Sequence, residues 1–219
     1  MKSERELLDR LRTDADDGRR LFSNPGQGLQ ERTAVAGLLR VLGVPFEERE
    51  IIKRGPEPID VWFQEARFQV TEVLDSGRRR NAEWREIAER RRKTRSLVDL
   101  VTPGVISSTS ASPDEVLGLV HDACRRKHAK YGSNCGSVDA LVYVNLKGRH
   151  LYPTAPWPDT ARLEAMGWRS VSVIMEPYAA VLLACDDAPP FLRAVADETQ
   201  QWPELDSCFP VFARRRTSR

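Results

Sequence analysis

Pro58-Ile-Asp-Val-Trp-Phe-Gln-Glu-Ala-Arg-Phe-Gln-Val-Thr-Glu72 is the stretch of sequence that decides the fold. Ile59 to Phe63 is an apolar, aromatic run, and Arg67 to Leu74 alternates apolar with polar side chains; both patterns are typical of β-strands. The short segment 64–66 between them is polar enough to turn. The stretch therefore predicts a β-hairpin.

The two acids of this hairpin are Asp60 and Glu72. A charge inside an apolar strand is costly unless it is paired or holds a cation. If the turn is centred near Glu65, Asp60 lies opposite Val70, and Glu72 projects from the same face one diagonal step away. Two converging carboxylates make a site for a hard divalent cation such as Mg²⁺. The alternative is an edge strand whose acids are simply solvated.

Charge is distributed unevenly along the 219 residues, whose net charge is only +2. The segment from Arg78 to Arg95 holds nine Lys or Arg residues against three Glu. Such a segment suits a polyanion, although a solvated helix has the same composition. Arg78, Arg79 and Arg80 follow the hairpin directly and can clamp phosphates bidentately. Three positive charges at a helix start oppose the helix dipole, which favours the binding interpretation.

The chain carries no sign of export or of a membrane span. Its first residues, Met1 to Asp17, are charged and lack the apolar core of a signal peptide. No apolar stretch approaches the length that crosses a bilayer. The four cysteines have no framework spacing. These features predict a cytoplasmic protein with reduced thiols and no membrane partner.

The remaining pattern predicts an α/β fold in which helices flank a mixed central β-sheet. The expected helices are residues 4–12, 29–42, 81–100, 114–131, 160–166 and 191–195. The expected strands are residues 45–52, 59–63, 67–74, 138–146, 169–175 and 178–185. Residues 103–113 are expected to form a loop and 213–219 a disordered basic tail.

The domain organisation expected from these elements has three parts. Residues 1–23 form an N-terminal helical extension, residues 24–200 form the main domain, and residues 201–219 form a C-terminal tail. The basic segment is a helical insertion at about 78–112. The hydrophobic fraction of 41% is enough for a sizeable core in the main domain.

The order helix, three strands, long helix, strand, with acids on the first helix and the hairpin, resembles the PD-(D/E)xK nuclease superfamily. This resemblance covers about Gln27 to Leu146 and implies a restriction-endonuclease-like core. Four runs also resemble a small bacterial family of unknown function that is described only as predicted endonucleases. They are Phe-Gln-Val-Thr-Glu-Val-Leu-Asp-Ser-Gly-Arg-Arg-Arg-Asn-Ala-Glu-Trp (68–84), Tyr-Gly (131–132), Leu-Val-Tyr-Val-Asn-Leu (141–146) and Gly-Trp-Arg-Ser-Val-Ser (167–172). They extend the resemblance to about Arg193.

The superfamily resemblance implies roles for three acids. Asp60 matches the first acid of the superfamily, Glu72 the second, and Glu31 the acid on the helix. In that mechanism the carboxylates hold one or two Mg²⁺ (or Mn²⁺) ions, and a metal-bound water attacks a phosphodiester. The resemblance thus implies Glu31, Asp60 and Glu72 as metal ligands.

The chain departs from the superfamily pattern where a lysine is expected, because that position is Leu74. Gln69 is an alternative ligand, and Arg78 or Lys127 can supply the missing cation. One interpretation is therefore a metal-dependent endonuclease acting on DNA, with Asp60, Glu72, Gln69 and Lys127 as catalytic residues. The other is a catalytically inactive domain that binds nucleic acid, or a protein interaction module. DNA is the expected partner, and homodimer formation is left open.

Cys124, His128 and Cys135 make a partial zinc set. Cys124 and His128 lie four residues apart and share a helix face. No fourth ligand follows at a known spacing, so the sequence does not favour zinc.

Overall fold

The computed structural model describes residues 3–53, 57–100, 108–151, 156–196 and 198–201 of the chain. The expected tail at 213–219 and residues 103–107 of the expected loop lie outside these ranges. The chain forms two compact units. The first comprises residues 1–30, 76–106 and 207–219, and the second comprises residues 31–75 and 107–206. No helix among the described residues is both long and apolar enough to cross a membrane.

The second unit is built on a seven-stranded sheet with the order β1-β2-β3-β5-β7-β8-β9. The strands are β1 Ile52–Lys53, β2 Val61–Phe63, β3 Ala66–Leu74, β5 Asp139–Asn145, β7 Ser170–Met175, β8 Tyr178–Ala184 and β9 Thr199–Gln201. β3, β5 and β7 pair in parallel, and the outer pairs are antiparallel. The short strands β4 Thr109–Ala111 and β6 Arg149–Leu151 form a separate parallel pair. The mixed sheet confirms the predicted α/β class.

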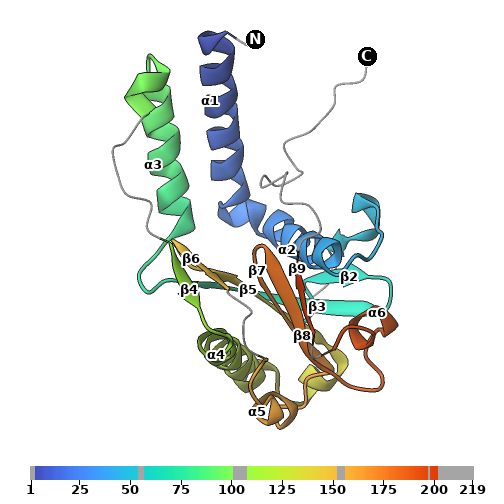
Figure 1. Ribbon diagram of the computed structural model, residues 1–219. Coiled ribbons are helices and arrows are strands. Elements are labelled where there is room, and N and C mark those ends of the chain that lie inside the picture. The colour runs from blue at the N-terminus through green and yellow to red at the C-terminus, as the bar shows by residue number, and fades with distance from the viewer. Residues whose placement is uncertain (1–2, 54–56, 101–107, 152–155, 197, 202–219) are drawn as a thin grey trace. The chain divides into compact units, whose positions relative to one another are not determined.

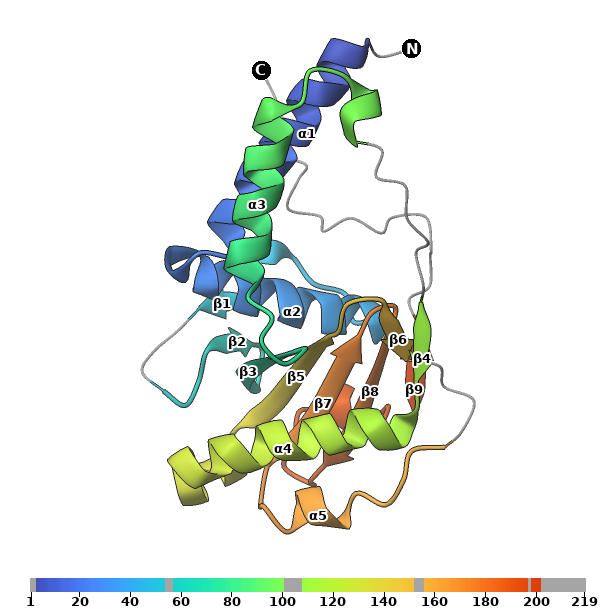
Figure 2. The same cartoon turned by 90° about the vertical axis from the view of Figure 1, so that its left-hand side faces the viewer.

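Helices cover both faces of this sheet. α2 (Gln27–Val41) buries Val35, Leu38 and Leu39 in a core that includes Phe68 of β3. α4 (Pro113–Tyr131), drawn in lime green in Figure 2, buries a second stripe in the core of the opposite face. The second stripe consists of Val116, Val120, Ala123 and Cys124. Strand residues of alternate parity therefore enter two different cores, as the pleat requires.

α4 has well-defined ends that the sequence encodes locally. Ser112 is its N-cap: the hydroxyl accepts a hydrogen bond from the Glu115 N–H, and the Glu115 carboxylate accepts one from the Ser112 N–H. This reciprocal capping box satisfies two otherwise free amides. Pro113 occupies the first turn, where its missing N–H is harmless. Gly132 ends the helix at φ 55°, a conformation that few other residues adopt without strain.

The first unit is a pair of helices, α1 (Glu4–Leu21) and α3 (Arg80–Lys93), which lie side by side in Figures 1 and 2. Leu8 and Ala15 of α1 and Ala88 of α3 are buried. A Cβ atom at Gly18 would lie 2.3 Å from Cε3 of the Trp84 ring, so only glycine fits there. The N-terminal extension and the basic insertion thus form one unit, a pairing that the sequence did not predict.

Four expected elements differ from the structure. The helix expected at 4–12 extends to Leu21, and the helix expected at 81–100 ends at Lys93, with a separate 3₁₀ turn at Leu97–Leu100. The strand expected at residues 45–52 is reduced to β1, because residues 48–50 form a 3₁₀ turn. The Glu50 carboxylate accepts a hydrogen bond from the Glu47 N–H, which stabilises the turn instead of a strand. In addition, part of the expected loop at 103–113 forms strand β4. The smaller helices are α5 Ala161–Glu164 and α6 Pro190–Arg193, close to their expected positions.

Candidate active site

The β2–β3 hairpin places Asp60 against Gln69. Val61 pairs with Phe68 and Phe63 with Ala66, so the register continues to Asp60 opposite Gln69. The Asp60 carboxylate accepts hydrogen bonds from Gln69 Nε2 at 3.0 Å and from the Val70 N–H at 2.9 Å. Both hydrogen bonds end on Oδ2, which leaves Oδ1 available to a ligand. The sequence-based register, with Asp60 opposite Val70, is wrong by one residue because the turn is tighter than expected.

Gln69 belongs to a polar set on the α4 face of the sheet. It is only 2% exposed, and its Oε1 accepts a hydrogen bond from the Thr71 hydroxyl at 3.1 Å. Gln69 and Thr71 line a small pocket together with Lys127 of α4 and the buried Trp168. The pocket has no room for a water molecule in this conformation. Lys127, a candidate from the sequence, therefore lies on the same side of the sheet as Gln69.

Burial and neighbouring charges set the protonation of Asp60. Burial raises the pKa of its carboxyl group, while the Val70 N–H and the charge of Lys127 act in the opposite direction. Glu57, just before the hairpin, contributes to the upward shift of the Asp60 pKa. Glu57 itself forms an ion pair with Lys130, whose hydrogen bond lowers the pKa of the Glu57 carboxyl group. The charges of Lys127 and Glu57 thus act on Asp60, and Lys130 acts on Glu57.

Glu72 does not converge with Asp60, contrary to the prediction from the sequence. Thr71, in register with Val142, faces the α4 side of the sheet. Glu72 is the next residue and is in register with Tyr143, which packs on the α2-side core. Successive strand residues point to opposite faces, so the one-residue register error moved Glu72 across the sheet. The two carboxylates therefore do not form a shared metal site in this structure.

Glu31 also lies on the α2 side. It is on α2, one turn before the buried Val35, and is itself only 6% exposed. Its carboxylate lies 3.7 Å from Lys53 Nζ of β1. Glu72 accepts a hydrogen bond from Asn145 Nδ2 at 3.1 Å. The roles of Glu31 and Glu72 as metal ligands stay predictions. Any metal ion that they hold would lie on the α2 side of the sheet, away from Asp60.

Arg78, Arg79 and Arg80 belong to the helical unit. Arg78 Nε donates to Glu83 Oε1 at 2.8 Å. The Arg80 guanidinium lies 3.6 Å from the centroid of the Phe22 ring, a cation–π contact. Arg79, the N-cap residue of α3, is exposed. Two of the three predicted phosphate contacts thus have intramolecular partners, and their nucleic-acid role stays a prediction.

Because Glu31 and Glu72 lie on the α2 side of the sheet, a Mg²⁺ ion at Asp60 would have fewer carboxylate ligands than the resemblance implies. Asp60 would offer a carboxylate oxygen, and a flip of the Gln69 amide would place Oε1 beside Asp60. Mg²⁺ commonly takes one or two carboxylates and completes its shell with water and substrate phosphates. Among the residues that the structure describes, no three His, Cys, Asp or Glu side chains gather into a metal-holding group. That also holds for the partial zinc set at Cys124, His128 and Cys135.

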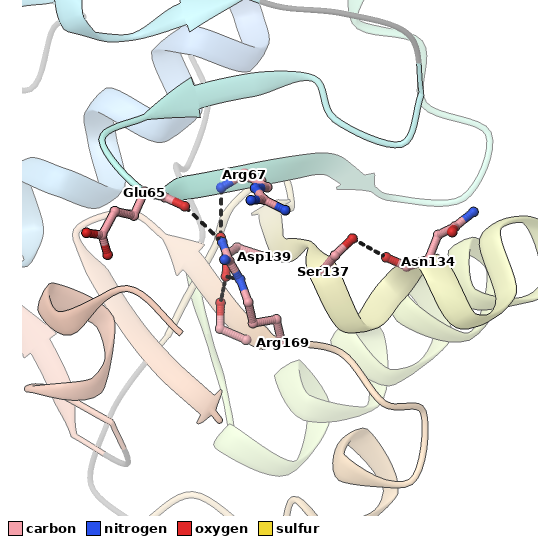
Figure 3. Close-up of polar contacts among 7 residues, drawn as sticks. Glu65, Arg67, Asn134, Ser137, Asp139 and Arg169 are labelled. Atoms are coloured by element: carbon pink, nitrogen blue, oxygen red, sulfur yellow. Dashed lines mark hydrogen bonds and ion pairs between the residues drawn. The ribbon is translucent and has the colours of Figure 1, made fainter. Parts of the chain in front are cut away.

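A buried ion pair supports the hairpin, and the sequence analysis missed it. Asp139, at the start of β5, is fully buried, and Arg169, just before β7, is 7% exposed. Arg169 donates to both carboxylate oxygens of Asp139, and its Nη2 also donates to the carbonyl of Glu65 at 3.1 Å (Figure 3). Ser170 Oγ and the Arg67 N–H complete the shell of Asp139. The pair therefore ties the hairpin turn to the central strands.

One signal for this pair was present in the sequence. Asp139 is a lone acid at the start of the most apolar strand, and the Gly-Trp-Arg-Ser run precedes the next strand. Because β5 and β7 are parallel neighbours, residues at their starting ends lie side by side. A buried charge needs a partner, so Arg169 was the natural candidate.

Comparison with known proteins gives a family and a fold relative. A family model described as "Putative endonuclease, protein of unknown function (DUF1780)" matches residues 3–203. A solved structure from Pseudomonas aeruginosa strain PAO1 is similar over 91% of this chain and 96% of its own, with 26% identity and a TM-score of 0.64. It is described as a protein of unknown function of the monooxygenase superfamily. None of the curated proteins matches this chain.

Proposed function

The chain belongs to this family described by an endonuclease name, and from that premise we propose that it is a metal-dependent nuclease that hydrolyses phosphodiester bonds in DNA. The observation that carries the proposal is the placement of Asp60 against Gln69, on the sheet face that also presents Lys127. Within a restriction-endonuclease-like core this hairpin position is the one that holds the first acid of the motif. The family supports the nuclease class, and the finer assignments are ours.

Each side chain of the site has a separate task in the proposed reaction. Asp60 would hold a cation through Oδ1, since its Oδ2 already accepts hydrogen bonds from Gln69 and Val70. Gln69 holds the Asp60 carboxylate in place and offers an amide oxygen after a flip. Lys127 supplies positive charge for a phosphate oxygen, the task of the lysine that Leu74 replaces. When bound, Mg²⁺ neutralises charge on the phosphate and lowers the pKa of a water.

A monooxygenase is a weaker candidate. That word belongs to the description of the structural relative, not to this chain. The pocket beside Gln69 is far smaller than the several hundred Å³ that a flavin or an organic substrate needs, so this pocket lends that class no support. A catalytically inactive domain that binds nucleic acid remains the second candidate, favoured by the single carboxylate of the site and by Leu74 in the lysine position.

The test is a cleavage assay on single-stranded, duplex and branched DNA with Mg²⁺ and with Mn²⁺. We expect Asp60→Asn to abolish cleavage, because it keeps the volume and removes the charge that holds the cation. Gln69→Ala should reduce cleavage less, since Gln69 supports the carboxylate. Glu72→Gln is the matched control: it removes one carboxylate from the same strand pair, but on the opposite sheet face, and should leave cleavage intact.

The Glu72→Gln control also tests whether the active site lies on the opposite face of the sheet. If Glu72→Gln abolished cleavage while Asp60→Asn did not, the active face would be the α2 face, with Glu31 and Glu72 as the predicted ligands. No cleavage of any DNA by the wild type, together with no metal-induced rise in thermal stability, would refute both the nuclease and its metal site.

A further inference from the structure

The C-terminal half of α4 carries a dense set of cations. Four of the six residues from Arg125 to Lys130 are arginine or lysine. Asp122, one turn earlier, lies 3.6 Å from Arg125 and partly neutralises it. Cations near a helix C-terminus also favour the helix dipole, so their number alone does not define a site. Whether these cations form a binding surface depends on their orientation relative to the hairpin.

Lys127 and its neighbours face different surroundings. Lys127 lines the pocket with Gln69 and Thr71, so it points towards the sheet. Arg126 and Lys130 are four residues apart and share a flank of α4, and both are exposed. Arg126 forms no ion pair with any residue in the described part of the chain. These three residues, Arg126, Lys127 and Lys130, are called the α4 cation flank below.

An acid just before the hairpin, Glu57, already contacts the α4 cation flank. The Glu57 carboxylate pairs with Lys130, and it is close enough to Lys127 for that charge to lower the pKa of Glu57 further. The same carboxylate contributes to the raised pKa of Asp60. Glu57 thus pairs with Lys130 and interacts electrostatically with both Lys127 and the candidate catalytic acid Asp60.

We propose that the α4 cation flank binds the sugar–phosphate backbone of DNA, and that a backbone phosphate displaces Glu57 from Lys130. This inference rests on the proposed function, since it names the surface by which the substrate reaches Asp60. Arg126 and Lys130 are separated by about 6 Å along the helix axis, which allows contact with one or two successive phosphates. DNA is favoured over an acidic protein because Lys127, which belongs to the flank, lies on the sheet face of the proposed phosphodiester-cleaving site; polyglutamate is the competitor that separates the two.

The experiment measures binding of a short fluorescent DNA duplex to the full-length chain by anisotropy, over a range of salt concentrations. The buffer holds EDTA and the protein carries Asp60→Asn, so that binding is measured without cleavage. Arg126→Ala should weaken binding several-fold and reduce the magnitude of the salt slope by about 0.9. Arg126→Ala with Lys130→Ala should reduce it by about 1.8. Lys147→Ala, which removes an exposed cation beyond the other end of β5, is the matched control and should change the slope little.

Glu57 provides a test of opposite sign. Glu57→Gln should tighten binding, because the phosphate no longer competes with a carboxylate for Lys130. Its matched control is Glu65→Gln, an exposed acid in the turn at the other end of the hairpin, which should have little effect. If Glu57 only stabilised the fold of this region, Glu57→Gln would weaken DNA binding. The sign of the change in affinity therefore separates competition with phosphate from a structural role.

The outcomes keep this inference distinct from the proposed function. If the wild type cleaves DNA but the double variant keeps its affinity and salt slope, the α4 cation flank is refuted while the nuclease stands. If the wild type does not cleave DNA but the salt slopes change as expected, the α4 cation flank is supported as the DNA-binding surface of a catalytically inactive domain. Equal binding of polyglutamate, tested as a competitor, would point to an acidic protein partner and overturn the proposal, as would an unchanged affinity in Glu57→Gln.

Discussion

Asp139→Ala should be among the most damaging single substitutions in the sheet unit. The change removes the acceptor of four hydrogen bonds, two from Arg169 and one each from Ser170 Oγ and the Arg67 N–H. It leaves the Arg169 guanidinium, 7% exposed, without its counter-charge. Removing one partner of a buried pair costs about 3–5 kcal/mol. A typical domain has only about 5–15 kcal/mol of stability, so much of the unit's stability would be lost.

Two measurements test this prediction: urea unfolding gives the free energy of unfolding, and native-state hydrogen exchange is measured at the β5 and β7 amides. The exchange of these amides reports on the sheet unit rather than on the helical pair. Asp187→Ala, at an exposed acid, is the control and should stay within about 0.5 kcal/mol of the wild type. Replacing both partners, Asp139→Leu with Arg169→Met, should recover much of the loss, because no charge is then left unpaired. A loss below about 1 kcal/mol for Asp139→Ala would refute the reasoning, since it would mean that water already reaches the pair.

Three further predictions concern other parts of the chain. Val142→Ala in central β5 should cost about 1–3 kcal/mol by the same unfolding measurement, because Val142 is 2% exposed; no effect would place β5 at an exposed edge. Gly18→Ala should loosen the α1–α3 pair by displacing Trp84, and unchanged hydrogen exchange in both helices would contradict that close contact. In the metal-free protein, Asp60 should titrate above the ordinary aspartate range by carboxyl NMR, and Glu57→Gln should lower its pKa; an unshifted titration would mean that Asp60 is hydrated.

The sign of the Asp60 effect on stability follows from its raised pKa. Between the ordinary aspartate pKa and the raised folded value, the folded chain binds more protons than the unfolded chain. The contribution of Asp60 to stability is therefore greatest below that window and falls as the pH rises through it. Asp60→Asn should accordingly cost the metal-free protein little stability at neutral pH, so that a loss of cleavage can be assigned to chemistry.

Local patterns predicted most of the fold. α2, α4, β3, β5, β7 and β8 lie within two residues of their expected bounds, because hydrophobic period, capping residues and turn residues agree at each of them. α1 was predicted too short, since residues 13–20 carry few apolar side chains, yet the helix continues to Leu21 in contact with α3. Only the tertiary partner explains that extension, and no local pattern encodes it.

The candidate site was predicted in its residues more than in its geometry. Asp60, Gln69 and Lys127 were named from the sequence, and the structure brings them to one face of the sheet. Glu72 was assigned to the wrong face because the hairpin register was taken one residue out. Strand periodicity is two, so a single-residue error in a turn reverses every facing assignment beyond it. The Asp139–Arg169 pair was missed because its partners are far apart in the chain.

The parallel pairing of β3 with β5 also dictates when the sheet can form during synthesis. Residues 75–138, which include all of α3 and all of α4, separate the two strands. At typical elongation rates of about 5–20 residues per second, β5 is made roughly 3–13 s after β3. The β2–β3 hairpin must wait during that interval without the strand that covers its inner edge, whereas α1 and α3 are both complete well before β5. A nascent chain of this protein is therefore most prone to aggregation after β3 has emerged and before Asn145 has.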